Sequence, residues 1–350
     1  MQKAEPLFEN DSPEAARAVP GAKNLPSLFD ELDAQPLPWD ERMDRIDDAA
    51  RILDADPAAF SHLVVERLRC GDRLPEQPGS VGAFEAASSD LAFPLLDDAL
   101  GISICAPDWR ELLSNGFVRT ATEMACGRPV LLCADERAPE LAFAIRDAFH
   151  SAGFSAGSIA VTENARRDDL KELLADPRVR AVSASGSAAR IVELRHLCQQ
   201  TGIESQRLVT LRCAAYEVDV GEDIEAAAKR VAFRAFGLNT CGGQLPGQVA
   251  RAFIPQASYS SFVECLLECM DTIDELRSLV AHIDRDAALR TQKAWIQGLD
   301  EGATMISGGE EEMTGDPLRL PPTVFCNVEP HMRGARRQEP LPVLCLLRSS

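Results

Sequence analysis

The sequence predicts an α/β protein with an open, parallel β-sheet. Short, unbroken apolar runs are typical of strands buried on both faces of such a sheet. They lie at residues 129–133, 158–161, 179–183 and 208–211. Amphipathic segments alternate with these runs and predict helices at residues 117–126, 140–152, 168–175 and 191–200. Gly127 and Gly153 follow two of them in the position of a C-terminal cap. This alternation places ligands at the carboxyl ends of the strands.

The region before residue 101 is predicted to be an appendage to this sheet. Residues 1–38 combine Pro, Asp and Glu with few periodic apolar positions, which indicates a loose arm. Residues 39–70 have helical periodicity, and residues 71–89 are rich in Gly, Pro and Ser. We therefore expect a helical segment and linker over 39–100.

Charge and hydropathy exclude several classes of partner. The 350 residues include 36 Lys and Arg against 55 Asp and Glu, so the formal net charge is −19. Phosphates of nucleic acids and anionic membrane surfaces would repel such a chain, and we expect it to bind neither. No apolar run approaches the roughly 18 residues that span a bilayer, and no signal-peptide pattern opens the chain. A soluble, cytoplasmic protein is predicted.

The eleven cysteines are scattered through apolar segments, without a Cys-x-x-Cys pair. The five histidines do not lie at zinc-binding spacings. The pattern predicts reduced thiols, mostly in the core, and no metal site.

A series of short motifs between about residues 101 and 345 resembles the aldehyde dehydrogenase superfamily in order and spacing. The motifs lie at residues 127–139, 149–153, 176–179, 183–187, 223–227, 243–254, 301–309, 322–324 and 332–333. The resemblance implies a Rossmann-like cofactor domain over 101–207 and a catalytic-type α/β domain over 208–350, shortened at its C-terminus. It also implies NAD(P)-dependent oxidation of an aldehyde to a carboxylate through a cysteine thiohemiacetal and a thioester.

The cofactor motifs of the resemblance are partly retained. Gly186 and Ser187 match the Gly-Ser pair that opens a helix beside the cofactor pyrophosphate in the family. Amides at a helix N-terminus form an anion site. A plain strand-to-helix turn with Ser185 or Ser187 as the N-terminal cap is an equal alternative.

Two further cofactor contacts are implied by the resemblance. Glu136 matches the acidic residue that binds the adenosine ribose, although Cys133 replaces the lysine of that motif. Gln338 matches the family's glutamate at the nicotinamide ribose, where Pro340 replaces an aromatic residue. The chain is therefore expected to bind NAD or NADP with reduced affinity.

The catalytic motifs depart from the family pattern. Pro246 stands at the position of the nucleophilic cysteine, and proline carries no nucleophile. Arg212 stands at the position of the general base, and a guanidinium cannot accept a proton near neutral pH. Arg110 replaces the asparagine that supplies an amide to the oxyanion and could stabilise negative charge. Cys241, in a Gly-rich turn that we expect to be exposed, is a test candidate for a substitute nucleophile.

Three functions are compatible with these residues. The first is an active oxidoreductase with a non-standard site. The second is a catalytically impaired relative, a pseudoenzyme that binds a nucleotide or a protein partner. The third is a non-redox enzyme that holds a small anionic ligand with Arg110, Arg212 and Cys241. The loss of both nucleophile and base favours the second. The shortened second domain is expected to leave a strand edge through which a homo-oligomer could form.

Overall fold

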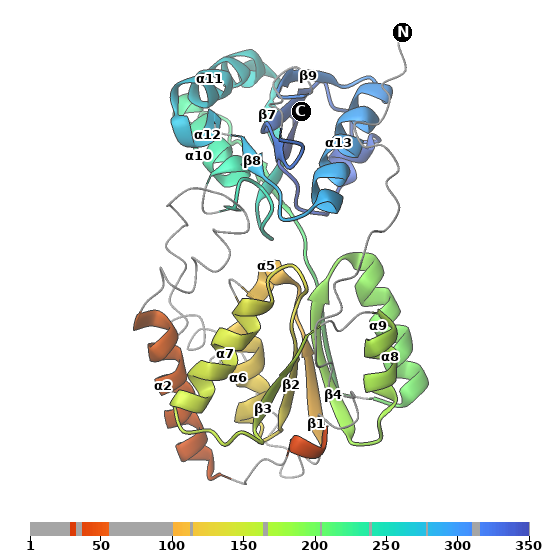
Figure 1. Cartoon of the computed structure of the whole chain (residues 1–350). Helices are drawn as coiled ribbons and strands as arrows, with labels where there is room; N and C mark the ends of the chain where they lie inside the picture. The colour runs from red at the N-terminus through yellow and green to blue at the C-terminus, as the bar shows by residue number, and fades with distance from the viewer. Residues whose placement is uncertain are drawn as a thin grey trace.

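The computed structural model describes residues 29–32, 37–55, 101–112, 115–163, 167–203, 205–237, 240–277, 279–309 and 316–349. The predicted linker and most of the predicted arm lie outside these residues. The described part forms two α/β units, which occupy the lower and upper halves of Figure 1.

The first unit is an open sheet of five parallel strands in the order β3-β2-β1-β4-β5. The strands are β1 (Ile102–Ala106), β2 (Val130–Cys133), β3 (Ile159–Thr162), β4 (Val179–Gly186) and β5 (Ser205–Thr210). The α/β class and the parallel sheet are thereby confirmed. The sequence places the last strand at 208–211 and the unit boundary at 207, but β5 pairs with β4 through Thr210. The first sheet therefore extends to Thr210.

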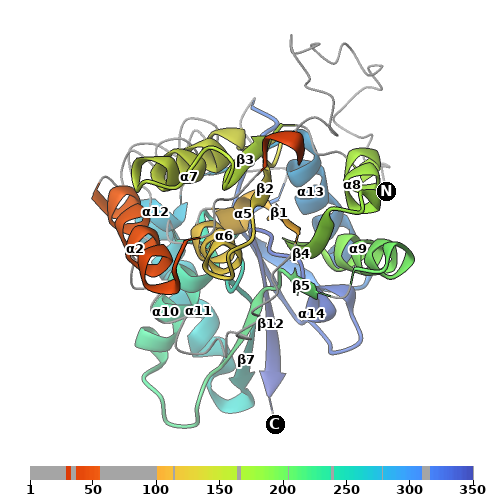
Figure 2. The same cartoon turned by 90° about the horizontal axis from the view of Figure 1, so that it is seen from below.

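Helices cover both faces of this sheet (Figure 1). One face carries α2 (Trp39–Ala55), α5 (Trp109–Leu112), α6 (Gly116–Ala125) and α7 (Pro139–Ser151). The other carries α8 (Arg167–Ala175) and α9 (Ala188–Thr201). Alternate side chains of one strand enter the two cores, with Cys105 on the first side and Ile104 on the second. α2 lies beside α6 and α7, as Figure 2 shows. Of the predicted helical segment at residues 39–70, the structure describes α2, which ends at Ala55; the rest lies outside the described residues.

The second unit contains a five-stranded sheet in the order β6-β7-β12-β11-β9. The strands are β6 (Ala214–Glu217), β7 (Val249–Pro255), β9 (Thr304–Ser307), β11 (Thr323–Cys326) and β12 (Val343–Ser349). Only the β9–β11 pair is antiparallel. A small antiparallel pair joins β8 (Val280–Ala281) to β10 (Arg319–Leu320). β12 lies in the middle of the described sheet, and β6 and β9 form its edges.

Helices also cover both faces of the second sheet. α10 (Ile224–Phe236) and α11 (Tyr259–Thr272) pack on one core. α13 (Arg285–Asp300) and α14 (Arg333–Arg336) pack on the other. The 3₁₀ turn η2 (Gln256–Ser258) and the short α12 (Asp274–Arg277) flank α11. A turn at residues 240–247 links α10 to β7, and its Cys241 and Leu245 belong to the core of the first unit. The two units therefore share buried contacts.

Three expectations about composition can be compared with the described residues. All ten cysteines among them are at least partly buried. They contain no group of three His, Cys, Asp or Glu side chains that could hold a metal ion. Within the same residues, no helix has the length and apolar character needed to cross a bilayer.

Candidate functional site

The carboxyl ends of β1, β2 and β4 meet at one edge of the first sheet. β1 lies between β2 and β4. The chain leaves β2 for α7 on one face, whereas it leaves β4 for α9 on the other. This is a topological switch point, where open α/β sheets bind their ligands. The segments after these strands, at residues 107–110, 134–137 and 187–190, are therefore the first candidates for a site.

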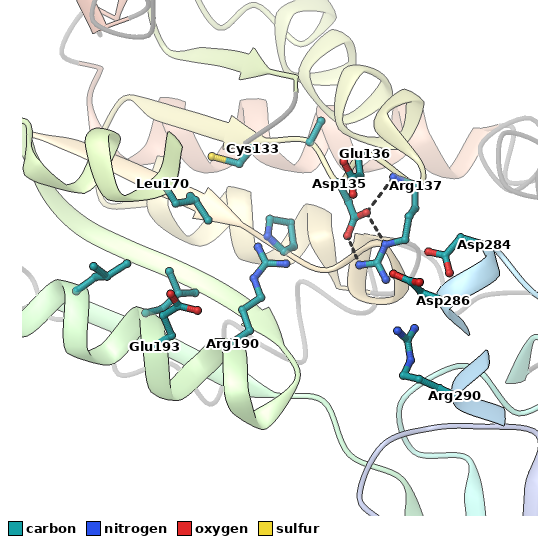
Figure 3. Close-up of a pocket in the computed structure, with 14 residues that line it drawn as sticks. Cys133, Asp135, Glu136, Arg137, Leu170, Arg190, Glu193, Asp284, Asp286 and Arg290 are labelled. Atoms are coloured by element: carbon teal, nitrogen blue, oxygen red, sulfur yellow. Dashed lines mark hydrogen bonds and ion pairs between the residues drawn. The ribbon is translucent and has the colours of Figure 1, made fainter. Parts of the chain in front are cut away.

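A cavity of about 320 Å³ lies at this edge, beside the beginning of α13 from the second unit (Figure 3). Cys133 and the leucines of α8 and α9 form its apolar part. Five carboxylates and three guanidinium groups form its charged part. These are Asp135, Glu136, Glu193, Asp284, Asp286, Arg137, Arg190 and Arg290. The volume is within the range of sites for small ligands.

The structure places the predicted cofactor residues in two different positions around this cavity. Glu136, directly after β2, is exposed and lines the cavity together with the buried Cys133. Ser187 is the N-terminal cap of α9, and its side chain accepts a hydrogen bond from the Arg190 N–H at 3.3 Å. Gly186 and Ser187 shape the first turn of α9 and are absent from the cavity lining. The alternative reading of Ser187 as a helix cap is confirmed, and a role in binding pyrophosphate stays a prediction.

Arg190 is a cavity residue that the sequence reasoning missed. Its side chain extends from the first turn of α9 into the cavity (Figure 3), where one guanidinium nitrogen donates to the Ala106 carbonyl at 3.3 Å. Gly186 makes room for this side chain, because a Cβ there would lie 2.7 Å from the Arg190 Cδ. A cation at the positive end of a helix is unfavourable unless an anion lies nearby. An arginine three residues after a serine cap was the available signal.

Four buried or half-buried charges close one end of the cavity. Arg137 donates to Asp135 at 2.6 Å and to Asp108 at 3.2 Å, while Arg110 pairs with Asp108 at 2.8 Å. Burial would raise the pKa of Asp108, but the hydrogen bonds and charge of Arg110, with the charge of Arg137, lower it to about 2. The Trp109 N–H also donates to Asp135 at 3.0 Å. All four charges are therefore held in place at neutral pH.

A second cavity beyond this network is almost filled. It has a volume of about 10 Å³, roughly the space of one water molecule. Its lining includes Trp109, Arg110, Arg137, Gln244, His282, Ile283, Ala287, Arg290, Glu339, Pro340 and Leu341. Gln244 is fixed because its amide nitrogen donates to the carbonyls of Cys241 at 3.0 Å and Ala281 at 2.9 Å. Arg137 and Arg290 line both cavities and separate them.

Pro246 and Arg212 lie on neighbouring backbone segments. The N–H of Gly247 donates to the Arg212 carbonyl at 2.9 Å, so the positions that the resemblance assigns to nucleophile and base are adjacent in space. The Arg212 side chain is exposed and that of Pro246 is half-buried. Neither residue lines either cavity. Arg110 does line the smaller one, but it is 7% exposed and paired with Asp108.

Cys241 does not lie in an exposed loop, contrary to the expectation. Its side chain is 4% exposed and packs in the core of the first unit. Its backbone has a φ of 48° within the tight turn that follows α10. The expectation was wrong because a Gly-rich turn normally lies at the surface, whereas this turn fills the junction between the two units. Arg110, Arg212 and Cys241 do not gather around either of the two cavities.

The segment that would hold the nicotinamide ribose is engaged in other contacts. Gln338 is exposed and absent from both cavity linings, and its carbonyl accepts from the Cys213 N–H at 2.7 Å. Glu339 pairs with Arg290 at 3.0 Å, and Pro340 is buried beside it. The predicted contact of Gln338 with a cofactor therefore stays a prediction.

The fold is that of a two-unit α/β protein with a cavity at the switch point of a parallel sheet. The model of the aldehyde dehydrogenase family matches residues 102–350. The chain belongs to the aldehyde dehydrogenase family.

Curated aldehyde dehydrogenases match the chain over part of their length. An aspartate-semialdehyde dehydrogenase of Halomonas elongata is 25% identical over 260 residues, which are 73% of this chain and 52% of the relative. A vanillin dehydrogenase of Pseudomonas fluorescens is 29% identical over 263 residues, covering 71% of this chain and 52% of that one. The chain thus spans about half the length of the curated relatives it matches.

Two solved structures share the fold. Aldehyde dehydrogenase C of Pseudomonas syringae, a mutant solved with NAD+ and octanal, superposes with a TM-score of 0.77 at 17% identity, over 93% of this chain and 72% of that one. An aldehyde dehydrogenase of Mycobacterium tuberculosis, solved with NAD+, gives a TM-score of 0.74 at 18% identity, over 93% and 72% of the two chains.

Proposed function

We propose that this protein binds an adenine nucleotide of the NAD type in the larger cavity and does not oxidise aldehydes by the covalent route of its family. The observation that carries the proposal is the cavity at the switch point, which presents Glu136 and Arg190 to one ligand. The solved relatives that share the fold include proteins crystallised with NAD+. In the family's reaction this cofactor accepts the hydride from the aldehyde adduct.

The lining fits the adenosine diphosphate half of such a cofactor. Glu136 can accept hydrogen bonds from the ribose hydroxyls, which favours NAD over NADP because a carboxylate repels a 2′-phosphate. Leu170, Leu194 and Leu197 offer an apolar surface to the adenine ring. Carboxylates outnumber guanidinium groups in the lining, so Arg190 and the amide end of α9 are needed to hold the diphosphate.

The residues at the reacting positions argue against turnover. Without a thiol at Pro246, no thiohemiacetal forms there, so no hydride leaves from a covalent adduct. Arg212 remains protonated and cannot activate water to release a product. Both losses act on the same sequence of steps, so a protein without the nucleophile has no use for the base.

Calorimetric titration with NAD+, beside NADH formation over a panel of aldehydes, tests the proposal. We expect binding without turnover. Turnover would instead establish an active oxidoreductase with a non-standard site, and the absence of nucleotide binding would leave a binding or scaffold role without nucleotide.

The Glu136→Gln variant tests the ribose contact. Loss of a charge-assisted hydrogen bond is expected to weaken NAD+ binding by about tenfold, measured by the same titration. Glu172→Gln is the matched control, because Glu172 is exposed on α8 and absent from the cavity lining. Equal affinities of the two variants would contradict a role for Glu136.

A further inference from the structure

The space available in the cleft is unequal at its two ends. The cavity that contacts α9 encloses about 320 Å³, whereas the cavity beside Gln244 and Pro340 encloses about 10 Å³. The larger one is sufficient for an adenosine diphosphate group. The smaller one lies where the family motifs around Gly243-Gln244 and residues 338–340 converge, and it has no space for a nicotinamide ring.

The boundary between the two cavities consists of arginines that are already paired. Arg137 is bound by Asp135 and Asp108, and its pKa is raised by these carboxylates and by Asp284, although burial acts in the opposite direction. Arg290, on α13, pairs with Glu339. Displacing Arg137 would remove one cationic partner from each of the buried carboxylates Asp108 and Asp135, which is unfavourable.

Residues on the far side of this boundary are also tightly held. Trp109 is 2% exposed, and Pro340 is buried in the segment where the resemblance implies an aromatic contact. His282 lines the smaller cavity, with its Nε2 2.9 Å from the Thr291 hydroxyl and its Nδ1 3.2 Å from two backbone carbonyls. A ligand entering this end would have to displace several packed side chains at once.

We propose that the cleft recognises a nucleoside diphosphate, adenosine diphosphate, and that the nicotinamide riboside half of a dinucleotide contributes nothing to binding. This rests on the proposed function, since it assigns the same cavity to the same adenosine group. ADP presents the adenine to the leucines, the ribose to Glu136 and the diphosphate to Arg190. The cofactor's reactive half is left outside the protein, without a residue to hold it.

Titration of the wild-type protein with ADP, ADP-ribose and NAD+ tests this inference. We expect ADP to bind at least as tightly as NAD+. Binding of NAD+ or of ADP-ribose about tenfold or more tighter than that of ADP would overturn the inference while leaving the proposed function intact. If none of the three ligands binds, the proposed function itself fails. Thermal unfolding of the wild-type protein in the presence of each ligand gives a second measurement, because a ligand that binds only the folded state raises the melting temperature.

The Arg190→Ala variant tests whether Arg190 contacts the diphosphate of ADP. We expect it to weaken ADP binding by about tenfold or more and adenosine binding by much less. Arg195→Ala is the matched control, because Arg195 is exposed on the same helix and lines neither cavity. An equal loss for ADP and adenosine would show that Arg190 does not contact the diphosphate and would overturn its assignment.

Discussion

Pro246 and Arg212 stand, by the resemblance, at the positions of the family's nucleophile and general base. The Gly247 N–H still bonds the Arg212 carbonyl, so the two segments keep their contact although neither side chain can act as nucleophile or base. The assignment of these two positions stays a prediction from the sequence. The sequence was not sufficient to predict that Arg212 is exposed and that Cys241 is buried, because burial in a turn depends on what packs over it.

His282 provides a pH-dependent prediction at the same scale. Burial lowers its pKa to about 4, below its usual value of 6.5, although two backbone carbonyls act in the opposite direction. The unfolded chain therefore binds more protons at this residue between these pH values. The contribution of His282 to stability is complete above pH 6.5 and is lost as pH falls toward 4. We expect the free energy of unfolding to decrease over this window by up to about 3 kcal/mol from this residue.

Denaturant unfolding at several pH values measures this effect. The His282→Gln variant is expected to be less stable at neutral pH but to have a flatter pH dependence between pH 5 and 7. His331→Gln is the control, because His331 is exposed and its removal should preserve the wild-type slope. Equal slopes for wild type and His282→Gln would exclude this assignment.

Cys241 yields a prediction about reactivity. Because its thiol is 4% exposed in the shared core, we expect the native protein to react with a thiol reagent at other positions first. The wild type and Cys241→Ala should therefore have the same number of thiols that react rapidly with the reagent. Any aldehyde oxidation should be the same in the two proteins. One rapidly reacting thiol fewer in Cys241→Ala than in the wild type would show that the Cys241 thiol is accessible.

At the scale of elements, the first sheet was more predictable than the second. The predicted runs at 129–133 and 179–183 coincide with the inner strands β2 and β4, which are almost entirely buried, whereas the run at 158–161 coincides with the partly buried edge strand β3. β5 was placed three residues late because it is an edge strand, where Ser205, Gln206 and Arg207 pair through the backbone without needing apolar side chains. No local pattern revealed that β12 joins β7 and β11, since strand order depends on distant pairings.

The turn after α10 gives a prediction about an element. Gly243 has a φ of 97°, and a Cβ there would lie 2.7 Å from the Ala235 carbonyl oxygen and 2.9 Å from the Pro342 Cα. These are backbone atoms that cannot rotate away. We expect Gly243→Ala to lower the free energy of unfolding by more than about 2 kcal/mol, measured by denaturant titration.

Gly247→Ala separates steric conflict from backbone strain. Gly247 also has a positive φ, of 81°, but a Cβ there meets nothing within 4 Å. Its replacement should cost only about 1 kcal/mol of backbone strain. If both variants lose the same stability, close packing at Gly243 is not the reason for its glycine.

At the scale of the whole molecule, the two units are joined by packing as well as by the chain. Leu245 belongs to the second unit by sequence but lies in the hydrophobic core of the first. We expect Leu245→Ala to destabilise the protein by about 2–5 kcal/mol and to reduce amide hydrogen-exchange protection in both units.

Leu299→Ala is the corresponding control. Leu299 is 53% exposed on α13, so its replacement should change stability by less than about 0.5 kcal/mol. Loss of exchange protection in the second unit alone, on replacing Leu245, would show that the two units unfold independently.

The central position of β12 affects how the protein is made. Arg251 of β7 pairs with Cys345 of β12, almost a hundred residues further along the chain. During synthesis the first sheet can assemble as soon as β5 has left the ribosome, whereas the strands of the second sheet remain in two separate groups until residues 343–349 emerge. Such distant pairings make folding slow. The apolar strand β7 therefore lacks its partner β12 while residues 256–342 are made, and during this time it is exposed to chaperones and to aggregation.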